Sequence, residues 1–397
     1  MVALSNRINK LSESETLAMS RKSRELKALG HDVINLSLGE PDFFTPDNIK
    51  EAAKKAIDEN YSFYTPVNGY LELRQAICHK LQRDNNLQYT PEQIVVSTGA
   101  KQALINVLLC LVNPGEEVLV PAPYWVSYSE MVKMTDGVEV NITAGIENDF
   151  KITPAQLEAA ITPNTKLFMF SSPCNPTGSV YTYEELKALA EVFERHPQVY
   201  ILSDEIYEHI NFMGKHESIA SFASIKDRVI VINGVSKGFA MTGWRVGYLA
   251  ASLEIAQACN KLQGQFTSGT CSIAQRATLE AMQADPSQTH QMLDKFRERR
   301  DLVLELMKDI PGMKTNLPQG AFYIFPNIEY YFGKANGESQ IDNAGDLCMY
   351  LLNKAHVALV PGSAFGNPSC IRFSYATSNE LLTEAVARIK KALAELK

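Results

Sequence analysis

The stretch "RVIVINGVSKGFAMTGWRVGY" (residues 228–248) joins an apolar run to a turn of small residues around a single lysine. Its first part is apolar and β-branched, which is typical of a strand buried on both faces of a sheet. Lys237 follows between Ser236 and Gly238, and Arg245 comes eight residues later. A buried strand that ends in one lysine among small residues indicates a site where a ligand comes close to the backbone.

Similar apolar runs recur along the middle of the chain. They are "QIVVSTG" (93–99), "EEVLVPAP" (116–123), "TKLFMFSSP" (165–173) and "VYILSDEIY" (199–207). Helical patterns separate them, two of which begin at Thr153 and Thr182 with a Gln or Glu three residues later, the spacing of a capping box. Strands that alternate with helices predict an α/β fold with a mostly parallel sheet covered on both faces.

The pattern changes near residue 285. A long charged helix precedes "GAFYIFP" (320–326) and "CIRFSYA" (370–376), and an amphipathic helix (381–396) follows them. We therefore expect a large α/β domain over 48–290 and a smaller α+β domain built from 1–47 and 291–397. The run "RERR" (297–300) is expected to be a solvated helix face.

Composition excludes several classes of protein. The 397 residues carry a net charge of −7, which argues against a nucleic-acid partner. No apolar run reaches the roughly 18 residues of a membrane span, and the N-terminus has no signal-peptide core. Seven scattered cysteines form no CxxC pair, and the histidines have no ligand spacing, so we predict no metal site and a reducing, cytoplasmic location.

Polar or aromatic groups follow nearly every apolar run. Because ligands bind at the carboxyl ends of strands in such sheets, we expect these groups to meet at one edge. They are Gly99, Ala100, Lys101, Trp125, Asn175, Asp204, Tyr207, Ser236, Lys237 and Arg245.

Together these groups suit one ligand. Small residues at a helix start, with Ser236 and Arg245, suit a phosphate. Trp125 offers a flat apolar face, and Asp204 can keep a ring nitrogen protonated. Tyr207 and Asn175 can hydrogen-bond a ring hydroxyl, and the Lys237 amine can condense with an aldehyde. A phosphorylated hydroxypyridine aldehyde is pyridoxal 5′-phosphate (PLP).

The motifs "SSPCNPTG" (171–178), "SDEIY" (203–207), "SKGFAMTGWRVGY" (236–248) and "IRFSYA" (371–376) resemble those of class I, fold-type I PLP-dependent aminotransferases. The resemblance extends from "LSLGEPDF" (36–43) to the last helix. It implies that Lys237 binds the cofactor covalently and moves a proton, and that Gly99, Ala100, Ser236 and Arg245 form the phosphate cup. It also implies that Arg372 clamps the substrate α-carboxylate near Gly39, and that Tyr64 reaches the cofactor of the partner subunit in a homodimer.

The same resemblance bears on the substrate. Lys101, in "TGAKQAL", is similar to a lysine of the bacterial aspartate aminotransferases, where a cation suits a distal carboxylate, and Thr16 resembles a helper at the same end. Prephenate-accepting members carry a basic residue four positions before that threonine, and here Ser12 stands there, with Glu13 and Glu15 nearby. We therefore expect aspartate and 2-oxoglutarate as substrates and doubt prephenate.

Three alternatives remain open. The chain could be an aminotransferase of alanine-, aromatic- or prephenate-type specificity, or a PLP-dependent carbon–sulfur lyase. It could also be a PLP-binding regulatory domain, although no DNA-binding helix pair precedes the first motif. The tight turn around Asn175 further predicts a cis peptide bond between Asn175 and Pro176.

Overall fold

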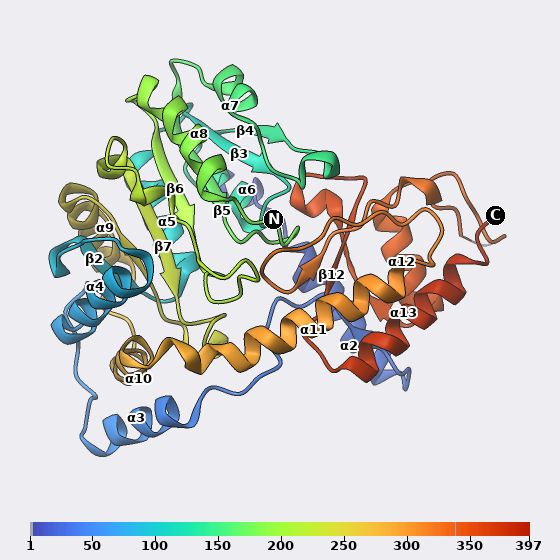
Figure 1. Cartoon of the computed structure of the whole chain (residues 1–397), viewed down its shortest axis with the longest axis horizontal. Coiled ribbons are helices and arrows are strands. Elements are labelled where there is room, and N and C mark those ends of the chain that lie inside the picture. Colours follow the sequence, from blue (N-terminus) through green and yellow to red (C-terminus); the bar gives the residue numbers. More distant parts are fainter. Residues whose placement is uncertain (1–2, 338) are drawn as a thin grey trace.

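A computed structural model describes residues 3–337 and 339–397, and a seven-stranded sheet forms the middle layer of its larger half, on the left of Figure 1. The strand order is β2-β8-β7-β6-β5-β3-β4. The strands are β2 (Ile94–Ser97), β3 (Glu117–Ala122), β4 (Val138–Thr143), β5 (Thr165–Ser171), β6 (Tyr200–Asp204), β7 (Val229–Gly234) and β8 (Gly247–Ala250). All strands of this sheet run in the same direction except β8, so the expected mostly parallel α/β sheet is confirmed.

Helices cover both faces of this sheet, because successive residues of its buried strands point to opposite sides. Ile201 and Val231 pack into one apolar cluster, whereas Leu202 and Ile232 pack into another. The first cluster includes residues of α3 (Asp47–Asp58), α4 (Leu71–Asn85), α7 (Pro154–Ala160), α8 (Tyr183–Arg195) and α10 (Ser272–Gln283). The second includes residues of α5 (Ala100–Leu111), α6 (Ser127–Met134) and α9 (Leu253–Phe266).

A third apolar cluster joins the two ends of the chain. It contains residues from α2 (Glu15–Ala28), α11 (His290–Met307), α12 (Ala344–Lys354) and α13 (Asn379–Leu393). Two small sheets lie here, one of β11 (Val360–Pro361), β12 (Ile371–Ser374) and β9 (Tyr323–Ile324), the other of β1 (Ile34–Asn35) and β10 (Val357–Ala358). The limits of the two expected domains stay a prediction, and residues 1–2 of the smaller one lie outside the described residues.

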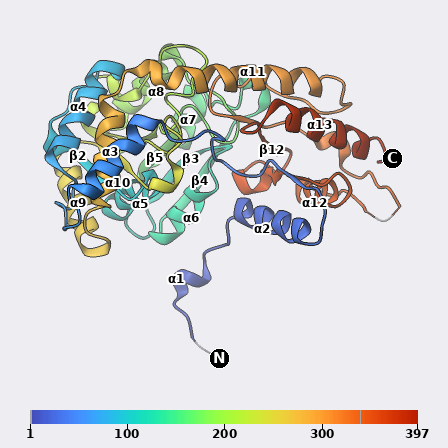
Figure 2. The same ribbon diagram turned by 90° about the horizontal axis from the view of Figure 1, so that it is seen from below.

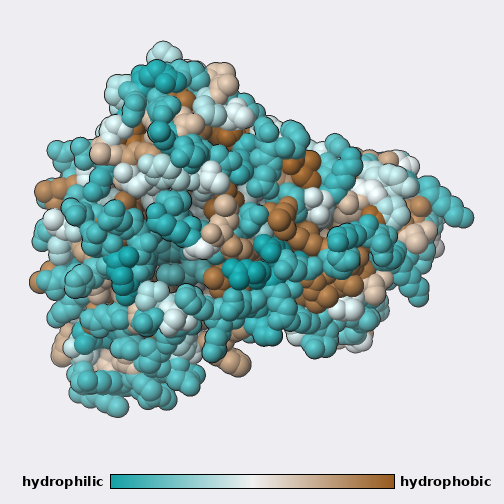
Figure 3. Space-filling model, viewed as in Figure 1, coloured by the Kyte–Doolittle hydropathy of each residue, from teal (hydrophilic) through white to brown (hydrophobic). Residues whose placement is uncertain are grey.

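The first residues of the chain extend away from this cluster, whereas α2 packs against it (Figure 2). In Figure 2, α1 (Asn6–Asn9) and α2 lie on the opposite side of the molecule from α11. Lys10 Nζ contacts Asp136 Oδ1 at 2.6 Å, which brings the segment onto the large sheet's half of the molecule. Figure 3 shows a mostly hydrophilic face with apolar side chains in separate patches. No described helix combines the length and the apolar character that a membrane crossing requires.

The structure agrees with three local predictions from the sequence and contradicts part of a fourth. Both expected capping boxes are present, at Thr153–Gln156 and Thr182–Glu185, and the Asn175–Pro176 bond is cis. The prediction that "RERR" is a solvated face was wrong for its last two residues. Arg299 is buried and forms a bidentate pair with Asp42 (2.6 and 2.8 Å), and Arg300 donates to the Pro318 carbonyl (3.0 Å). These partners are distant in sequence, so a local charge pattern did not reveal them.

Candidate active site

A cavity of about 450 Å³ lies at the carboxyl ends of β5, β6 and β7, where the large sheet meets the third apolar cluster. Most of the predicted site residues line it. They are Thr16, Gly39, Ala100, Lys101, Trp125, Asn175, Asp204, Tyr207, Ser236, Lys237, Arg245 and Arg372. The strand-end argument therefore placed residues from far-separated segments around one space.

Lys237 follows β7 and projects into this cavity. Its Nζ donates a 2.5 Å hydrogen bond to the Gly39 carbonyl and lies 5.8 Å from the centre of the Tyr207 ring. Burial lowers the pKa of Lys237 to about 8, although nearby Glu40 favours the charged form. An amine that gives up its proton this readily is suited to nucleophilic and base chemistry near neutral pH.

Asp204 ends β6 and is buried. Its Oδ2 accepts a 2.7 Å hydrogen bond from the Tyr128 hydroxyl, and its Oδ1 accepts a 3.3 Å bond from the Ile206 N–H. Burial raises the pKa of Asp204 to about 6, and the bond from Tyr128 opposes that rise. Sequence reasoning missed Tyr128, although its position three residues after Trp125, on the first turn of α6, could have indicated it.

A second group in the cavity wall consists of two tyrosines and an arginine. The hydroxyls of Tyr207 and Tyr323 lie 2.7 Å apart, and the Arg372 guanidinium lies 4.7 Å from the centre of the Tyr323 ring. Tyr323 is on β9, in the "GAFYIFP" motif, and sequence reasoning assigned it no role. The pair joins the large sheet's half of the site to the half formed by the chain ends.

Arg372 is buried on β12, and its fork is already oriented. Nη1 donates to Asn175 Oδ1 at 3.0 Å, and Nη2 donates to the Ser37 carbonyl at 2.5 Å. The buried Nε has no hydrogen-bond partner among the described residues. An unpaired donor on a buried guanidinium is costly, so this side chain is suited to receive an anionic ligand group.

The start of α5 forms a cradle at one side of the cavity. Gly99 precedes the helix with φ +83°, and a Cβ there would overlap the Arg245 guanidinium. Arg245, itself at φ +58°, donates to the Thr242 carbonyl at 3.0 Å. The first N–H groups of a helix have no partner within it, so this helix end with a guanidinium beside it is suited to bind a phosphate.

Lys101 and Thr16 also line the cavity. Lys101 Nζ is 4.9 Å from the centre of the Trp125 ring, and burial together with the nearby Arg245 lowers the pKa of Lys101. Thr16 Oγ1 is buried with no hydrogen-bond partner among the described residues. Both groups are therefore open to a polar ligand.

Tyr64 is the predicted site residue that this chain does not bring to the cavity. Its side chain is 99% exposed, beside Phe63 at 81%, in a shallow hollow with Tyr61 and Tyr70. Gly99 is absent from the cavity wall but contacts Arg245, which lines it. The role of Tyr64 in a partner subunit stays a prediction.

The cavity fits PLP in its donor chemistry. An amine, a buried carboxylate, a phenol and a flat indole face surround one space, and a helix end with a guanidinium adjoins it. Each complements one part of the cofactor, namely the aldehyde, the ring nitrogen, the ring oxygen, the ring face and the phosphate. The volume also lies within the ordinary range of small-molecule sites.

Known proteins match this chain over most or all of its length. Residues 31–389 match the family model "Aminotransferase class I and II". The aspartate/prephenate aminotransferase of Cereibacter sphaeroides is 48% identical over 401 residues, with all of each chain covered. A bifunctional aspartate and glutamate/aspartate-prephenate aminotransferase of Petunia hybrida is 47% identical and covers all of this chain and 84% of its own length.

Solved structures give the same result. The aspartate aminotransferase of Rhizobium meliloti superposes with a TM-score of 0.97 at 40% identity, covering 100% of both chains. The Thermus thermophilus aspartate aminotransferase with maleate gives 0.92 at 39% identity, covering 99% of this chain and 100% of its own. The chain belongs to the class I and II aminotransferase family, and the expected fold type I is confirmed. Membership of this family implies PLP as the cofactor.

Proposed function

We propose that this protein transfers the amino group of L-aspartate to 2-oxoglutarate with PLP as its cofactor. The observation that carries the proposal is the grouping in one cavity of the Lys237 amine, the Asp204 carboxylate and two cationic side chains, Lys101 and Arg372. Two cations suit a substrate with two carboxylates, and both aspartate and 2-oxoglutarate are of this kind.

The chain's own groups would hold the cofactor by its separate parts. Ser236, Arg245 and the first N–H groups of α5 bind the phosphate, and the Trp125 ring stacks on the pyridine. Asp204 binds the protonated ring nitrogen, since a carboxylate is the natural partner of that cation. Tyr207 and Asn175 hold the ring oxygen. When bound, PLP supplies an aldehyde that condenses with amines and a ring that takes up developing negative charge.

Lys237 performs the proton transfer in this proposal. Its Nζ removes the proton from the substrate α-carbon and delivers it on the cofactor side, acting first as base and then as acid. The lowered pKa of this lysine favours that exchange, because a catalytic base works best with a pKa near the working pH. The bond from Lys237 Nζ to the Gly39 carbonyl keeps the amine inside the cavity, where it can condense with the cofactor aldehyde.

Substrate orientation follows from the two cations. Arg372 binds the α-carboxylate with its planar fork, close to the Gly39 backbone, and its contacts to Asn175 and Ser37 hold that fork in place. Lys101 meets the distal carboxylate, with Thr16 Oγ1 as a further donor. Alternating amino donors and 2-oxo acid acceptors then give ping-pong kinetics.

The complete site in this proposal needs a homodimer. Tyr64 is almost fully exposed in one chain, and it would reach the phosphate of the partner's cofactor. Exposed Phe63 beside it would be covered by the same contact.

A half-reaction screen tests the function. The PLP-loaded protein is mixed with single amino acids, and the loss of the cofactor's visible absorbance is followed. We expect aspartate and glutamate to convert the cofactor far faster than alanine or phenylalanine, each with release of one equivalent of 2-oxo acid. Equal rates for alanine and aspartate would contradict the substrate assignment, and release of ammonia would indicate a lyase.

Prephenate is a second candidate acceptor, because relatives at 47–48% identity carry it in their names. The local structure favours aspartate, since Ser12 is exposed and uncharged and its N–H donates to Glu130 Oε2 at 2.8 Å. Two cations of that segment already have acidic partners, since Lys10 pairs with Asp136 and Arg21 pairs with Glu13. Turnover of prephenate with glutamate as donor, compared with that of 2-oxoglutarate and aspartate, decides between the two.

A further inference from the structure

The turn after β6 has two faces with different partners. Asp204 and Tyr207 line the cavity, whereas their neighbours Glu205 and Glu208 are buried away from it. The Glu208 N–H donates to the Glu205 carbonyl at 2.9 Å, so the turn is tight. Glu205 directly follows Asp204 in sequence, and Glu208 directly follows Tyr207. Contacts that hold the two buried carboxylates therefore also restrain the backbone of the two cavity residues.

Helix α4 binds Glu208. Lys80 Nζ, on a side chain that is 1% exposed, pairs with Glu208 Oε1, and Asn85 Nδ2 donates to Oε2 at 2.9 Å. Lys80 Nζ also donates to Asn85 Oδ1 at 2.9 Å, which closes a ring of three side chains. Burial works against the charge of Glu208, but Lys80, together with His209 and His216, outweighs it and holds the pKa of Glu208 well below its usual range.

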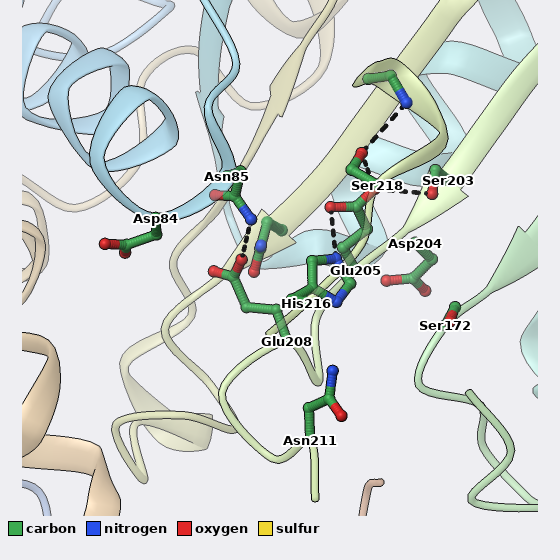
Figure 4. Close-up of polar contacts among 12 residues, drawn as sticks. Asp84, Asn85, Ser172, Ser203, Asp204, Glu205, Glu208, Asn211, His216 and Ser218 are labelled. Atoms are coloured by element: carbon green, nitrogen blue, oxygen red, sulfur yellow. Dashed lines mark hydrogen bonds and ion pairs between the residues drawn. The ribbon is translucent and has the colours of Figure 1, made fainter. Parts of the chain in front are cut away.

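Glu205 has a second set of partners (Figure 4). The hydroxyls of Ser203 and Ser218 donate to its Oε1 at 2.9 and 2.6 Å, and His216 Nε2 lies 2.9 Å from its Oε2. Burial acts against protonation of His216, but the adjacent Glu205 outweighs it and raises the pKa of His216. These bonds tie both ends of the 205–218 loop to one carboxylate.

The same group of buried polar residues also contacts the turn after β7 that carries Lys237. His209, next to Glu208, lies 3.3 Å from Glu208 Oε1, and a Cβ at Gly238 would come within 2.6 Å of the His209 ring. Gly238 follows Lys237 directly. Lys80, Glu205, Glu208, His209 and His216 thus form one largely buried polar cluster. This cluster packs behind three residues of the cavity, namely Asp204, Tyr207 and Lys237.

The cluster is not built as a cation site. Ligand atoms of Glu205, Glu208 and His216 lie within 4.8 Å of one another, but the oxygens already accept hydrogen bonds from protein donors. The Lys80 ammonium supplies the positive charge that an ion would bring. Satisfied, buried charge networks of this type specify geometry more than they add stability.

We propose that Glu205 and Glu208 are positioning residues, which, through buried bonds to His216 and Lys80, hold the turn that presents Asp204 and Tyr207 to the cofactor. The proposal rests on the proposed function. A positioning role of these two residues differs from a purely structural role in one respect. The hydrogen bonds and the ion pair fix the direction of the Glu205 and Glu208 carboxylates and so of the turn, which apolar packing of the same volume defines less closely.

The test replaces the whole ring of three side chains by apolar residues in the variant Lys80→Met/Asn85→Leu/Glu208→Leu, so that the buried Asn85 amide is not left without its partners. Such replacements often keep or restore stability, because no charge is left buried without its partner. We expect an apoprotein melting temperature within a few degrees of wild type, but a kcat lower by about tenfold or more with a smaller change in KM for aspartate. The pH titration of the bound cofactor's visible absorbance should shift its midpoint by about half a unit or more.

An exposed pair on α3 supplies the matched control. Glu51→Leu/Lys54→Met removes an ion pair of 2.6 Å with both side chains about two-thirds exposed, and it should change neither the midpoint nor kcat. A wild-type midpoint and kcat in the triple variant would overturn the proposal, as would losses that simply follow a lowered melting temperature. If that variant does not fold, Glu205→Gln decides by the same two readouts. Wild-type protein without aspartate turnover would instead contradict the proposed function.

Discussion

The Tyr128 hydroxyl lies 2.7 Å from Asp204 Oδ2 and donates to it, inside a site where both side chains are buried. The Tyr128 ring also meets the Trp125 ring edge-on, with centroids 5.7 Å apart. One residue of α6 therefore supports both the carboxylate and the indole that we assign to the cofactor ring. Without this donor, burial would raise the pKa of Asp204 still further.

Removal of that donor should weaken the enzyme without unfolding it. In Tyr128→Phe, Asp204 loses a hydrogen bond to a charged group, which is worth about 1.5–3 kcal/mol. We expect kcat/KM for aspartate to fall by about 10–100-fold and PLP to bind more weakly. Tyr183→Phe, a half-exposed tyrosine on α8, is the control and should behave as wild type. Unchanged kinetics in Tyr128→Phe would show that Tyr128 does not act on Asp204.

Asp204 should make the apoprotein less stable as the pH rises. Its pKa is about 6 in the fold against 3.8 in the unfolded reference, so the folded state binds the proton more tightly. Stability contributed by this group is therefore greatest below about pH 4 and falls as the pH rises to about 6, by up to about 3 kcal/mol.

The substitution Asp204→Asn tests this linkage. We expect the apoprotein variant to melt at a higher temperature than wild type at pH 8, with the difference shrinking toward pH 4. The same variant should lose most of its transaminase activity, because it has no charge for the ring nitrogen. Melting curves of both apoproteins between pH 4 and 8 measure the effect, and a variant that is less stable at every pH would refute it.

Lys237→Ala should abolish transamination while leaving PLP bound noncovalently. The α5 terminus, Ser236, Arg245 and Asp204 all remain, whereas the amine that we assign to proton transfer is absent. Equilibrium dialysis with PLP measures binding, and a coupled assay of oxaloacetate release measures turnover. Wild-type turnover by this variant would remove Lys237 from the mechanism.

Lys101→Ser should impair dicarboxylic substrates selectively. Loss of a charge-assisted bond to the distal carboxylate predicts a kcat/KM for aspartate that is lower by about 10–100-fold. Alanine, which has no such carboxylate, should be affected much less, and PLP affinity should hardly change. The measurement is the aspartate-to-alanine ratio in both proteins. An equal loss for both substrates would assign Lys101 to the cofactor or the fold.

The assignment of Tyr64 to the partner's cofactor predicts a homodimer whose active sites contain residues of both subunits. Sedimentation at micromolar concentration should give twice the mass of one chain. Tyr64→Phe should release PLP faster than wild type while retaining transamination when PLP is in excess, because only the phosphate contact from the partner is lost. A monomer with full activity on dilution would contradict both statements.

The sequence by itself determined the order of strands and helices along the chain and half of the residues that line the cavity. Hydrophobic periodicity is local, so "RVIVINGVS" and "TYEELKALAEVFERH" could be assigned as strand and helix without knowledge of their neighbours. The strand-end rule then brought Asn175, Asp204 and Lys237 together from segments far apart in the chain. The family motifs added Arg372, which no local pattern placed in the site.

Only the tertiary structure decided which residues support these groups. Tyr128, Tyr323 and Lys80 look like ordinary helix or strand residues until their partners, far away in sequence, are known. Arg299 was misassigned for the same reason, because Asp42 lies 257 residues away. Burial gives such polar groups their effect, since removal from water makes each unpaired charge costly and each hydrogen bond stronger. Burial is a property of the packed fold and not of any one segment.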